Sequence, residues 1–164
     1  MPQGRPRIGV IRWEELPGER IEDYWQRIEE AGGEAIDLHG PPTDIATLDG
    51  LILTGGFDIA PERYGDTPHA KTRPSEPERD TFEIELLRNA LADDLPETLA
   101  PGLTPTATSP DGIVEAVESG THRWVLGVQW HPERPEPDHP HFAIDSRHLF
   151  QALVHAAQKV TEGA

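Results

Sequence analysis

The sequence contains no cysteine among its 164 residues. This absence excludes disulfides, thiolate metal sites and a cysteine nucleophile within this chain. Apolar runs long enough to span a bilayer are also missing, and the amino-terminal residues include no apolar segment of the kind found in signal peptides. Together these absences predict a cytoplasmic protein that does not enter membranes.

Positive charge is scarce as well. Lys and Arg together number 14 against 30 Asp and Glu, so the formal net charge is −16. A strongly acidic surface repels phosphate backbones and anionic lipid headgroups. The composition therefore argues against nucleic acid and membrane surfaces as partners. The length predicts a single domain, residues 1–164, that is large enough to bury a core.

The amino-terminal third has the pattern of a parallel strand–helix–strand unit. A short β-branched run at 7–11 predicts a first strand, and the short run at 34–38 predicts a second. Between them, apolar residues at helical spacing predict a helix over 19–32. The apolar run 48–54 is typical of a central parallel strand that is covered on both faces. An α/β fold with an open, mostly parallel sheet follows.

The middle of the chain predicts a loop followed by a helix. Residues 59–78 are rich in proline and glycine and lack periodicity, whereas 81–95 carry an apolar stripe at helical spacing. Asp80 is placed to act as the N-cap of this helix, and Glu83 lies three residues later, as in a capping box.

The carboxyl-terminal part predicts a hairpin, a strand and a final helix. The hairpin has strands at 103–108 and 113–117 joined by a turn at 109–112. Residues 124–130 predict a buried strand, and 146–159 predict the closing helix.

Two features are candidates for chemistry. His131 and Glu133 follow the predicted strand at its carboxyl end, where open α/β sheets usually place their sites. A carboxylate in this position can fix the tautomer of a histidine and stabilise its charged form. Gly55-Gly56 follows the run 48–54 and has two interpretations. It is either a tight turn or a backbone N–H presented to a substrate oxyanion.

No metal site is predicted. Asp138, His139 and His141 lie close together, but structural zinc sites usually bring four ligands at recognisable spacing, so a solvated loop is the preferred interpretation.

Several segments together resemble class I glutamine amidotransferase-like hydrolases, and more narrowly the γ-glutamyl-γ-aminobutyrate hydrolase branch, peptidase family C26. The segments are 51–65, 78–87, 107–117 and 127–133, in the order of the family. The resemblance implies a flavodoxin-like open sheet with flanking helices. It also implies hydrolysis of γ-glutamyl amides by a Cys-His-Glu triad, through a thioester and without a cofactor.

Carried over position by position, the resemblance assigns the base to His131, the orienting acid to Glu133, and part of the oxyanion site to Gly55 and Gly56. The cysteine has no counterpart. After the helix at 81–95, the chain passes directly into a segment that resembles the family well downstream. The sequence therefore predicts a shortened family member in which a central strand-helix block, with the nucleophile elbow, is lost at a junction near 96–97.

None of the serines replaces the missing nucleophile. A serine nucleophile needs a Gly-x-Ser-x-Gly turn after an apolar strand, and no such context surrounds the candidates Ser75, Ser109, Ser119 and Ser146. Loss of a triad nucleophile lowers the rate on the order of a millionfold in a measured protease. Hydrolysis is therefore predicted to be absent, which makes His131 and Glu133 relics of the triad.

Two alternatives stay open. One is a non-catalytic module that binds a γ-glutamyl small molecule in the residual cleft, or that assembles through a bared sheet edge, for example as a homodimer. The other is a deletion or excision at the level of the gene. Without its central strand, the sheet is expected to pair the strand at 51–54 directly with the strand at 124–130, or to leave an edge that a second copy covers.

Overall fold

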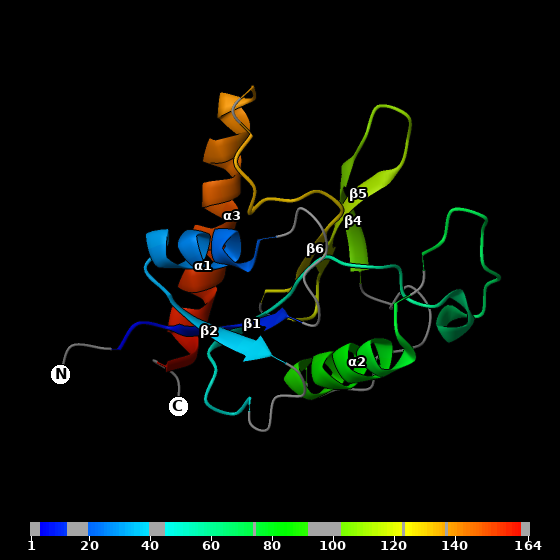
Figure 1. The fold of residues 1–164 in the computed structure, drawn as a ribbon. Helices are drawn as coiled ribbons and strands as arrows, with labels where there is room; N and C mark the ends of the chain where they lie inside the picture. The colour runs from blue at the N-terminus through cyan, green and yellow to red at the C-terminus, as the bar shows by residue number, and fades with distance from the viewer. Residues whose placement is uncertain are drawn as a thin grey trace. The chain divides into compact units, whose positions relative to one another are not determined.

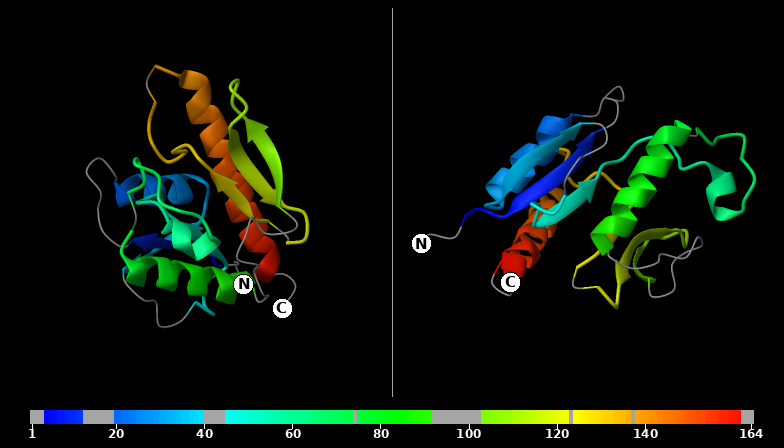
Figure 2. Two further views of the ribbon diagram at one scale, coloured as in Figure 1. Left: turned by 90° about the vertical axis from the view of Figure 1, so that its right-hand side faces the viewer. Right: turned by 90° about the horizontal axis from the view of Figure 1, so that it is seen from below.

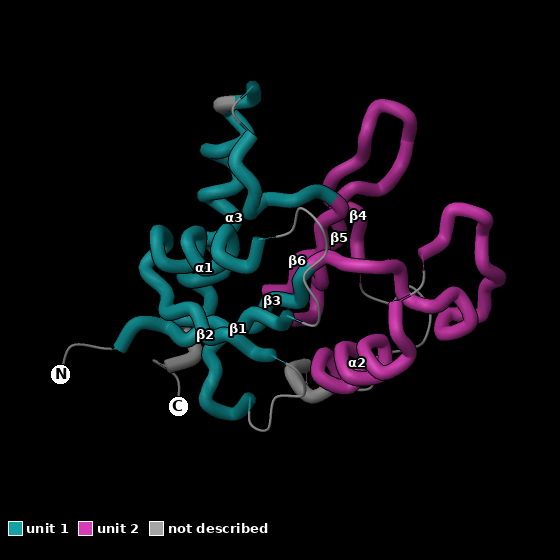
Figure 3. Tube along the Cα trace, viewed as in Figure 1, with its two compact units in different colours: residues 1–54, 130–164 teal, residues 55–129 magenta. Residues whose placement is uncertain are grey.

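The computed structural model describes residues 4–12, 20–39, 45–73, 75–91, 103–122, 124–136 and 138–161. The chain forms two compact units, residues 1–54 with 130–164 and residues 55–129 (Figure 3). The first is called unit 1 and the second unit 2. The predicted junction near 96–97 lies outside the described residues.

Unit 1 contains a parallel three-stranded sheet. Its strands are β1 (Arg7–Arg12), β2 (Glu34–His39) and β3 (Gly50–Leu53), in the order β2-β1-β3. Both β2 and β3 run parallel to β1. The α/β class and the strand–helix–strand unit predicted from the sequence are confirmed. The expected central position of the run 48–54 is not, because β1 is the middle strand among those the structure describes.

Two helices complete unit 1. Helix α1 (Ile21–Glu30) packs on β1 and β2, helix α3 (Pro140–Thr161) packs on β1 and β3, and the helices contact each other (Figures 1 and 2). Helix α1 ends at Glu30, and two residues later Gly32 has a positive φ of 93°, a conformation that glycine adopts without strain. Apolar side chains from all these elements are buried between them: Ile8, Val10, Ile11, Ile21, Tyr24, Ile28, Phe150, Leu153, Val154 and Ala157.

Helix α3 starts earlier than the predicted 146–159. It begins at Pro140, because a proline fits the first turn of a helix, where its missing N–H has no helical partner to lose. His141, which was assigned to a solvated loop, is therefore a helical residue, and its side chain is exposed.

Unit 2 contains a short 3-10 helix η1 (Pro61–Tyr64), helix α2 (Pro77–Leu91) and an antiparallel sheet. The sheet order is β4-β5-β6, with β4 (Leu103–Thr108), β5 (Val114–Ser119) and β6 (Leu126–Val128). The predicted hairpin is confirmed: β4 pairs with β5 across a turn in which the Gly112 N–H donates to the Ser109 carbonyl over 2.9 Å.

The start of α2 corrects the prediction for Asp80. The helix begins at Pro77, and the Asp80 N–H donates to the Glu76 carbonyl over 3.2 Å, so Asp80 lies inside the first turn and is not the N-cap. The sequence pattern placed the start at 81 because it followed the apolar stripe. The first turn carries charged residues whose contacts lie elsewhere in the unit.

The strand predicted at 124–130 is shorter and less buried than expected. Strand β6 covers Leu126–Val128, its side chains are partly or fully exposed, and it pairs antiparallel with β5. Among the described strands, β3 is paired with β1 and β6 with β5. The two strands, β3 and β6, belong to different units, and their pairing with each other stays a prediction. The described part of the chain also contains no helix long and apolar enough to cross a membrane.

Candidate functional site

His131 and Glu133 form a hydrogen-bonded pair in the segment between β6 and α3. The His131 Nδ1 lies 2.8 Å from the Glu133 Oε1. An ionised carboxylate only accepts hydrogen bonds, so in the neutral imidazole Nδ1 carries the proton and Nε2 carries the lone pair. This arrangement leaves Nε2 as the nitrogen able to accept a proton.

The two side chains differ in exposure. The Glu133 side chain is 3% exposed, whereas that of His131 is 39% exposed. Burial of a carboxylate is unfavourable unless charges and hydrogen bonds compensate. The Glu133 Oε1 receives the His131 contact and also lies 3.5 Å from the Arg134 Nε. Its second oxygen, Oε2, is buried with no hydrogen-bond partner among the described residues. The pair thus presents an accessible imidazole on a buried acid.

Helix α1 holds the backbone of this pair. The Arg27 Nε donates to the Glu133 carbonyl over 3.3 Å, and the Arg27 side chain is only 13% exposed. Both residues belong to unit 1. The long separation in sequence explains why the pattern of α1 alone gave no sign of this contact.

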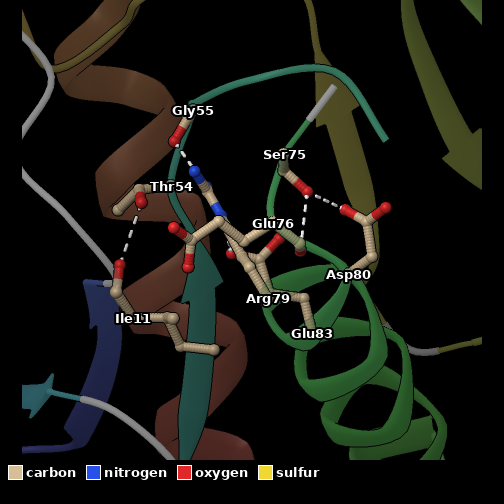
Figure 4. Close-up of polar contacts among 8 residues, drawn as sticks. All are labelled: Ile11, Thr54, Gly55, Ser75, Glu76, Arg79, Asp80 and Glu83. Carbon is tan, nitrogen blue, oxygen red and sulfur yellow. Dashed lines mark hydrogen bonds and ion pairs between the residues drawn. The ribbon is translucent and has the colours of Figure 1, made fainter. Parts of the chain in front are cut away.

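The Gly55-Gly56 turn begins two residues after β3. Immediately before it, the Thr54 hydroxyl donates to the Ile11 carbonyl over 2.9 Å, which fixes the end of the strand. The Gly55 carbonyl accepts a hydrogen bond of 2.9 Å from the Arg79 Nη2 (Figure 4). A Cβ on Gly56 would lie 2.5 Å from the Arg79 Cζ, closer than atoms can pack. The turn is therefore shaped by Arg79.

A buried polar cluster surrounds this arginine at the start of α2 (Figure 4). Arg79 is 6% exposed, and its Nε donates to the Glu83 Oε1 over 2.7 Å. Asp80 is 2% exposed and accepts from the Ala60 N–H over 2.9 Å and from the Ser75 hydroxyl. The sequence pattern does not single out Arg79. The only signal was its spacing of four from Glu83, which usually indicates a surface ion pair.

Three of the four serines considered as nucleophiles have structural contacts, whereas the Ser146 hydroxyl is buried with no hydrogen-bond partner among the described residues. The Ser75 hydroxyl donates to Asp80, and the Ser109 hydroxyl donates to Asp111 within the hairpin turn. The Ser119 Oγ lies 2.8 Å from the His122 Nδ1, but it also accepts from the His122 N–H over 3.2 Å. That pattern is typical of a hydroxyl that stabilises a tight turn.

The structure thus brings His131 to Glu133 in unit 1 and places Gly55 and Gly56 on Arg79 in unit 2. Among the described residues, no group of three or more His, Asp or Glu side chains is arranged to hold a metal ion.

Comparison with known proteins relates this chain to one hydrolase family. The family model for peptidase C26 matches residues 11–96 and 97–133. A glutamine amidotransferase-like protein of Mycobacterium tuberculosis is 27% identical, in an alignment covering 92% of this chain and 71% of the relative. A γ-glutamyl-γ-aminobutyrate hydrolase of Escherichia coli is 41% identical over 70 residues, 43% of this chain and 26% of the relative. A CTP synthase of Caulobacter vibrioides is 40% identical over 96 residues, 56% of this chain and 15% of the relative.

Two details of these matches concern the middle of the chain. The family match breaks into two segments that meet between residues 96 and 97. The alignment with the mycobacterial protein spans 228 positions, whereas this chain has 164 residues, so it includes positions at which this chain has no residue. The family match covers well over half of the sequence, and the chain belongs to the peptidase C26 family of class I glutamine amidotransferase-like hydrolases.

Proposed function

We propose that this chain is a hydrolytically inactive member of the family, which keeps the base and the orienting acid of the triad but lacks its nucleophile. One observation carries the proposal. The His131–Glu133 pair is assembled with a contact of 2.8 Å, while the sequence contains no cysteine. A general base without a thiol to deprotonate cannot start the family reaction.

The proposal includes the loss of an internal block. The split family match and the longer alignment with the mycobacterial relative support a junction at 96–97. Exposed apolar side chains in unit 2 support it too, because a lost block would have covered some of them. These side chains are Phe57, Ile59, Tyr64, Ile113 and Val114.

Loss of the elbow removes more than the thiol. In enzymes with a nucleophile elbow, the N–H after the nucleophile supplies an oxyanion donor, so this donor is lost as well. The rate falls on the order of a millionfold when a triad nucleophile alone is removed. The remaining His131, Glu133 and glycine turn would not restore hydrolysis.

The direct test is incubation of the purified chain with γ-glutamyl-γ-aminobutyrate, with release of glutamate or γ-aminobutyrate followed by mass spectrometry. No release above the uncatalysed rate is expected. Release that disappears in His131→Ala and persists in His139→Ala would overturn the proposal, because it would show that the retained base acts without a cysteine. His139 is an exposed histidine of the same unit and serves as the matched control.

A second candidate function is binding without catalysis. The observation that favours it is the buried anchorage of the Gly55-Gly56 turn on Arg79, which keeps a backbone site in shape. Calorimetric titration with γ-glutamyl-γ-aminobutyrate tests whether the chain binds this ligand. The absence of heat across the usable concentration range would rule out such binding.

An assembly role is the other form of this candidate. Strands β3 and β6 each pair with one described neighbour, and an edge strand offers unpaired N–H and C=O groups to another chain. Size-exclusion chromatography with light scattering tests whether a homodimer forms. A monomer across the accessible concentrations would count against it.

The origin of the junction is tested separately. The nucleotide sequence across codons 96 and 97 and the intact mass of the protein from its native source distinguish a natural deletion from an excision. A longer native protein that contains a cysteine in the added segment would overturn the proposal of an inactive chain.

A further inference from the structure

The Arg79 guanidinium is a buried cation with a specific set of partners in unit 2. It is 6% exposed. Its Nε donates to the Glu83 carboxylate over 2.7 Å, and its Nη2 donates to the Gly55 carbonyl over 2.9 Å. Glu83 supplies the countercharge, so burial of the cation is compensated. The second contact requires a different explanation, because a backbone carbonyl carries no charge.

That second contact fixes the orientation of the peptide between Gly55 and Gly56. A trans peptide is planar, so its C=O and N–H point in opposite directions. The described residues contain no cis peptide bond. With the Gly55 carbonyl directed at the guanidinium, the Gly56 N–H points away from Arg79. A donor N–H held in this way is what an oxyanion site requires.

The same guanidinium explains why residue 56 is glycine. A Cβ at this position would lie 2.5 Å from the Arg79 Cζ and closer still to both terminal nitrogens. Gly56 does not have the positive φ that makes glycine necessary at Gly65 and Gly112. The requirement is therefore steric and comes from Arg79. A larger residue would displace the guanidinium from Glu83 and from the Gly55 carbonyl.

The neighbouring residue anchors the base of this arginine. Asp80 is 2% exposed and ties the first turn of α2 to Ala60 and Ser75 through its carboxylate. This contact fixes the helix backbone from which Arg79 extends. The backbone of Arg79 is therefore held in place while its side chain extends to the turn.

From these contacts we propose that Arg79 is the positioning residue of the Gly55-Gly56 turn. It holds the Gly55 carbonyl, directs the Gly56 N–H outward and restricts position 56 to glycine. The ligand-facing role of that N–H rests on the binding function proposed above. The mechanical coupling between Arg79 and Gly56 does not, and it is tested without a ligand.

The test is a double-mutant cycle on the stability of the full chain. Gly56→Ala is made in the wild type and in Arg79→Gln, whose shorter side chain leaves the space beside position 56. In the wild type, Gly56→Ala should raise the equilibrium constant of unfolding about tenfold or more, because it displaces a buried arginine from two hydrogen bonds. In the Arg79→Gln background, Gly56→Ala should change the logarithm of the unfolding constant by less than half as much.

Amide hydrogen exchange distinguishes a local change at the turn from a general loss of stability. Arg79→Gln should accelerate exchange at Gly56 and Phe57 more than at the amides of β4 and β5 in the same unit. Arg79→Lys should restore the charge but not the turn, because an ammonium cannot reproduce the planar fork that reaches both partners. Arg88→Ala, at an exposed position of α2, is the matched control and should leave the turn unchanged.

Equal effects of Gly56→Ala in both backgrounds would overturn the proposal. Uniform acceleration of exchange across unit 2, with no excess at the turn, would overturn it as well. Neither result depends on hydrolysis or on ligand binding, so failure of the proposed function remains distinguishable from failure of this one.

Discussion

In unit 1 the buried side chains are mostly hydrocarbon, whereas in unit 2 half of the few buried residues are polar. Among the described residues, ten of the twelve buried hydrophobic ones belong to unit 1, and Leu86 and Ala116 belong to unit 2. Unit 2 also buries Pro61 and the polar residues Ser75, Arg79 and Asp80.

The difference determines how each unit responds to change. Hydrocarbon packing is distributed over many contacts of about equal strength, so a unit built from it loses stability in proportion to the volume removed. A buried polar cluster depends on each hydrogen bond, because a group left without its partner retains the full desolvation penalty. Five of the six large apolar residues exposed among the described residues also belong to unit 2. This unit therefore has the smaller apolar interior, which agrees with the proposed loss of an internal block.

The largest effect is expected from Ile28→Ala in α1. Ile28 is fully buried, and its removal leaves a cavity among the residues that pack α1 on the sheet. The free energy of unfolding should fall by about 3 kcal/mol. Urea denaturation followed by far-UV circular dichroism measures it. The control is Ile144→Ala on α3, where the side chain is 48% exposed and the change should stay within about 0.5 kcal/mol.

Asp80→Ala should have the next largest effect, and it tests the polar unit. The change removes the acceptor of the Ala60 N–H and of the Ser75 hydroxyl, so the loss should be about 2 kcal/mol. Glu85→Ala, at an exposed position of the same helix, should be nearly neutral. Similar values for Asp80→Ala and Glu85→Ala would mean that the polar cluster does not stabilise unit 2, and the contrast between the units would disappear.

A smaller effect is expected from Arg27→Ala, which removes a polar contact inside the apolar unit. The change deletes the hydrogen bond to the Glu133 carbonyl, and about 1 kcal/mol should be lost. The ¹⁵N signals of the His131 ring should also shift, because the backbone that carries Glu133 is released. Arg20→Ala, at a side chain that is 68% exposed, is the control. An unchanged His131 spectrum would mean that α1 does not hold the His131–Glu133 pair in place.

The smallest effect concerns Glu30 at the end of α1. A hydrogen bond from Gln26, aided by the charge of Arg27, lowers the pKa of Glu30 below its ordinary value of 4.5. A lowered carboxyl pKa stabilises the fold above the unfolded value, and the contribution is lost as the pH falls through the folded pKa. Because the side chain is 40% exposed, Glu30→Gln should reduce stability by only a few tenths of a kcal/mol at pH 7.

The pH dependence of that variant supplies its check. Denaturation midpoints of Glu30→Gln and of the wild type should converge as the pH falls from about 4.5 through the lowered pKa of the folded state, below which the carboxyl is protonated in both states. A difference that persists at pH 3 would assign the effect to packing and not to charge.

The parts of the fold that follow from local pattern were predictable from the sequence. Strand β1 is rich in β-branched residues, β2 is a second short run, and α1 has an apolar face at helical spacing that is soon followed by a glycine. The contact between His131 and Glu133 joins residues only two apart, so local sequence was enough to anticipate it. In each case the residues that determine the structure are neighbours in the chain.

The parts that depend on distant partners were not predictable in this way. The start of α2 at Pro77 and the internal position of Asp80 are fixed by Ala60 and Ser75, and the spacing of apolar residues carries no record of them. The role of Arg79 was not predictable because its spacing from Glu83 indicates an ordinary surface pair, whereas the decisive contact is with Gly55.

The His131–Glu133 contact and the Arg79–Gly55 hydrogen bond also differ in what they indicate about the history of the chain. The His131–Glu133 contact spans two residues, so closing it costs little conformational entropy in any chain that keeps this short segment. Such a contact forms wherever both residues are present, so its presence does not require selection for activity. The hydrogen bond from Arg79 to Gly55 spans 24 residues and exists only while the intervening loop and the start of α2 stay folded. Substitutions that accumulate freely at position 133 but not at positions 56 and 79 would mark a protein maintained for its folded turn and no longer for catalysis.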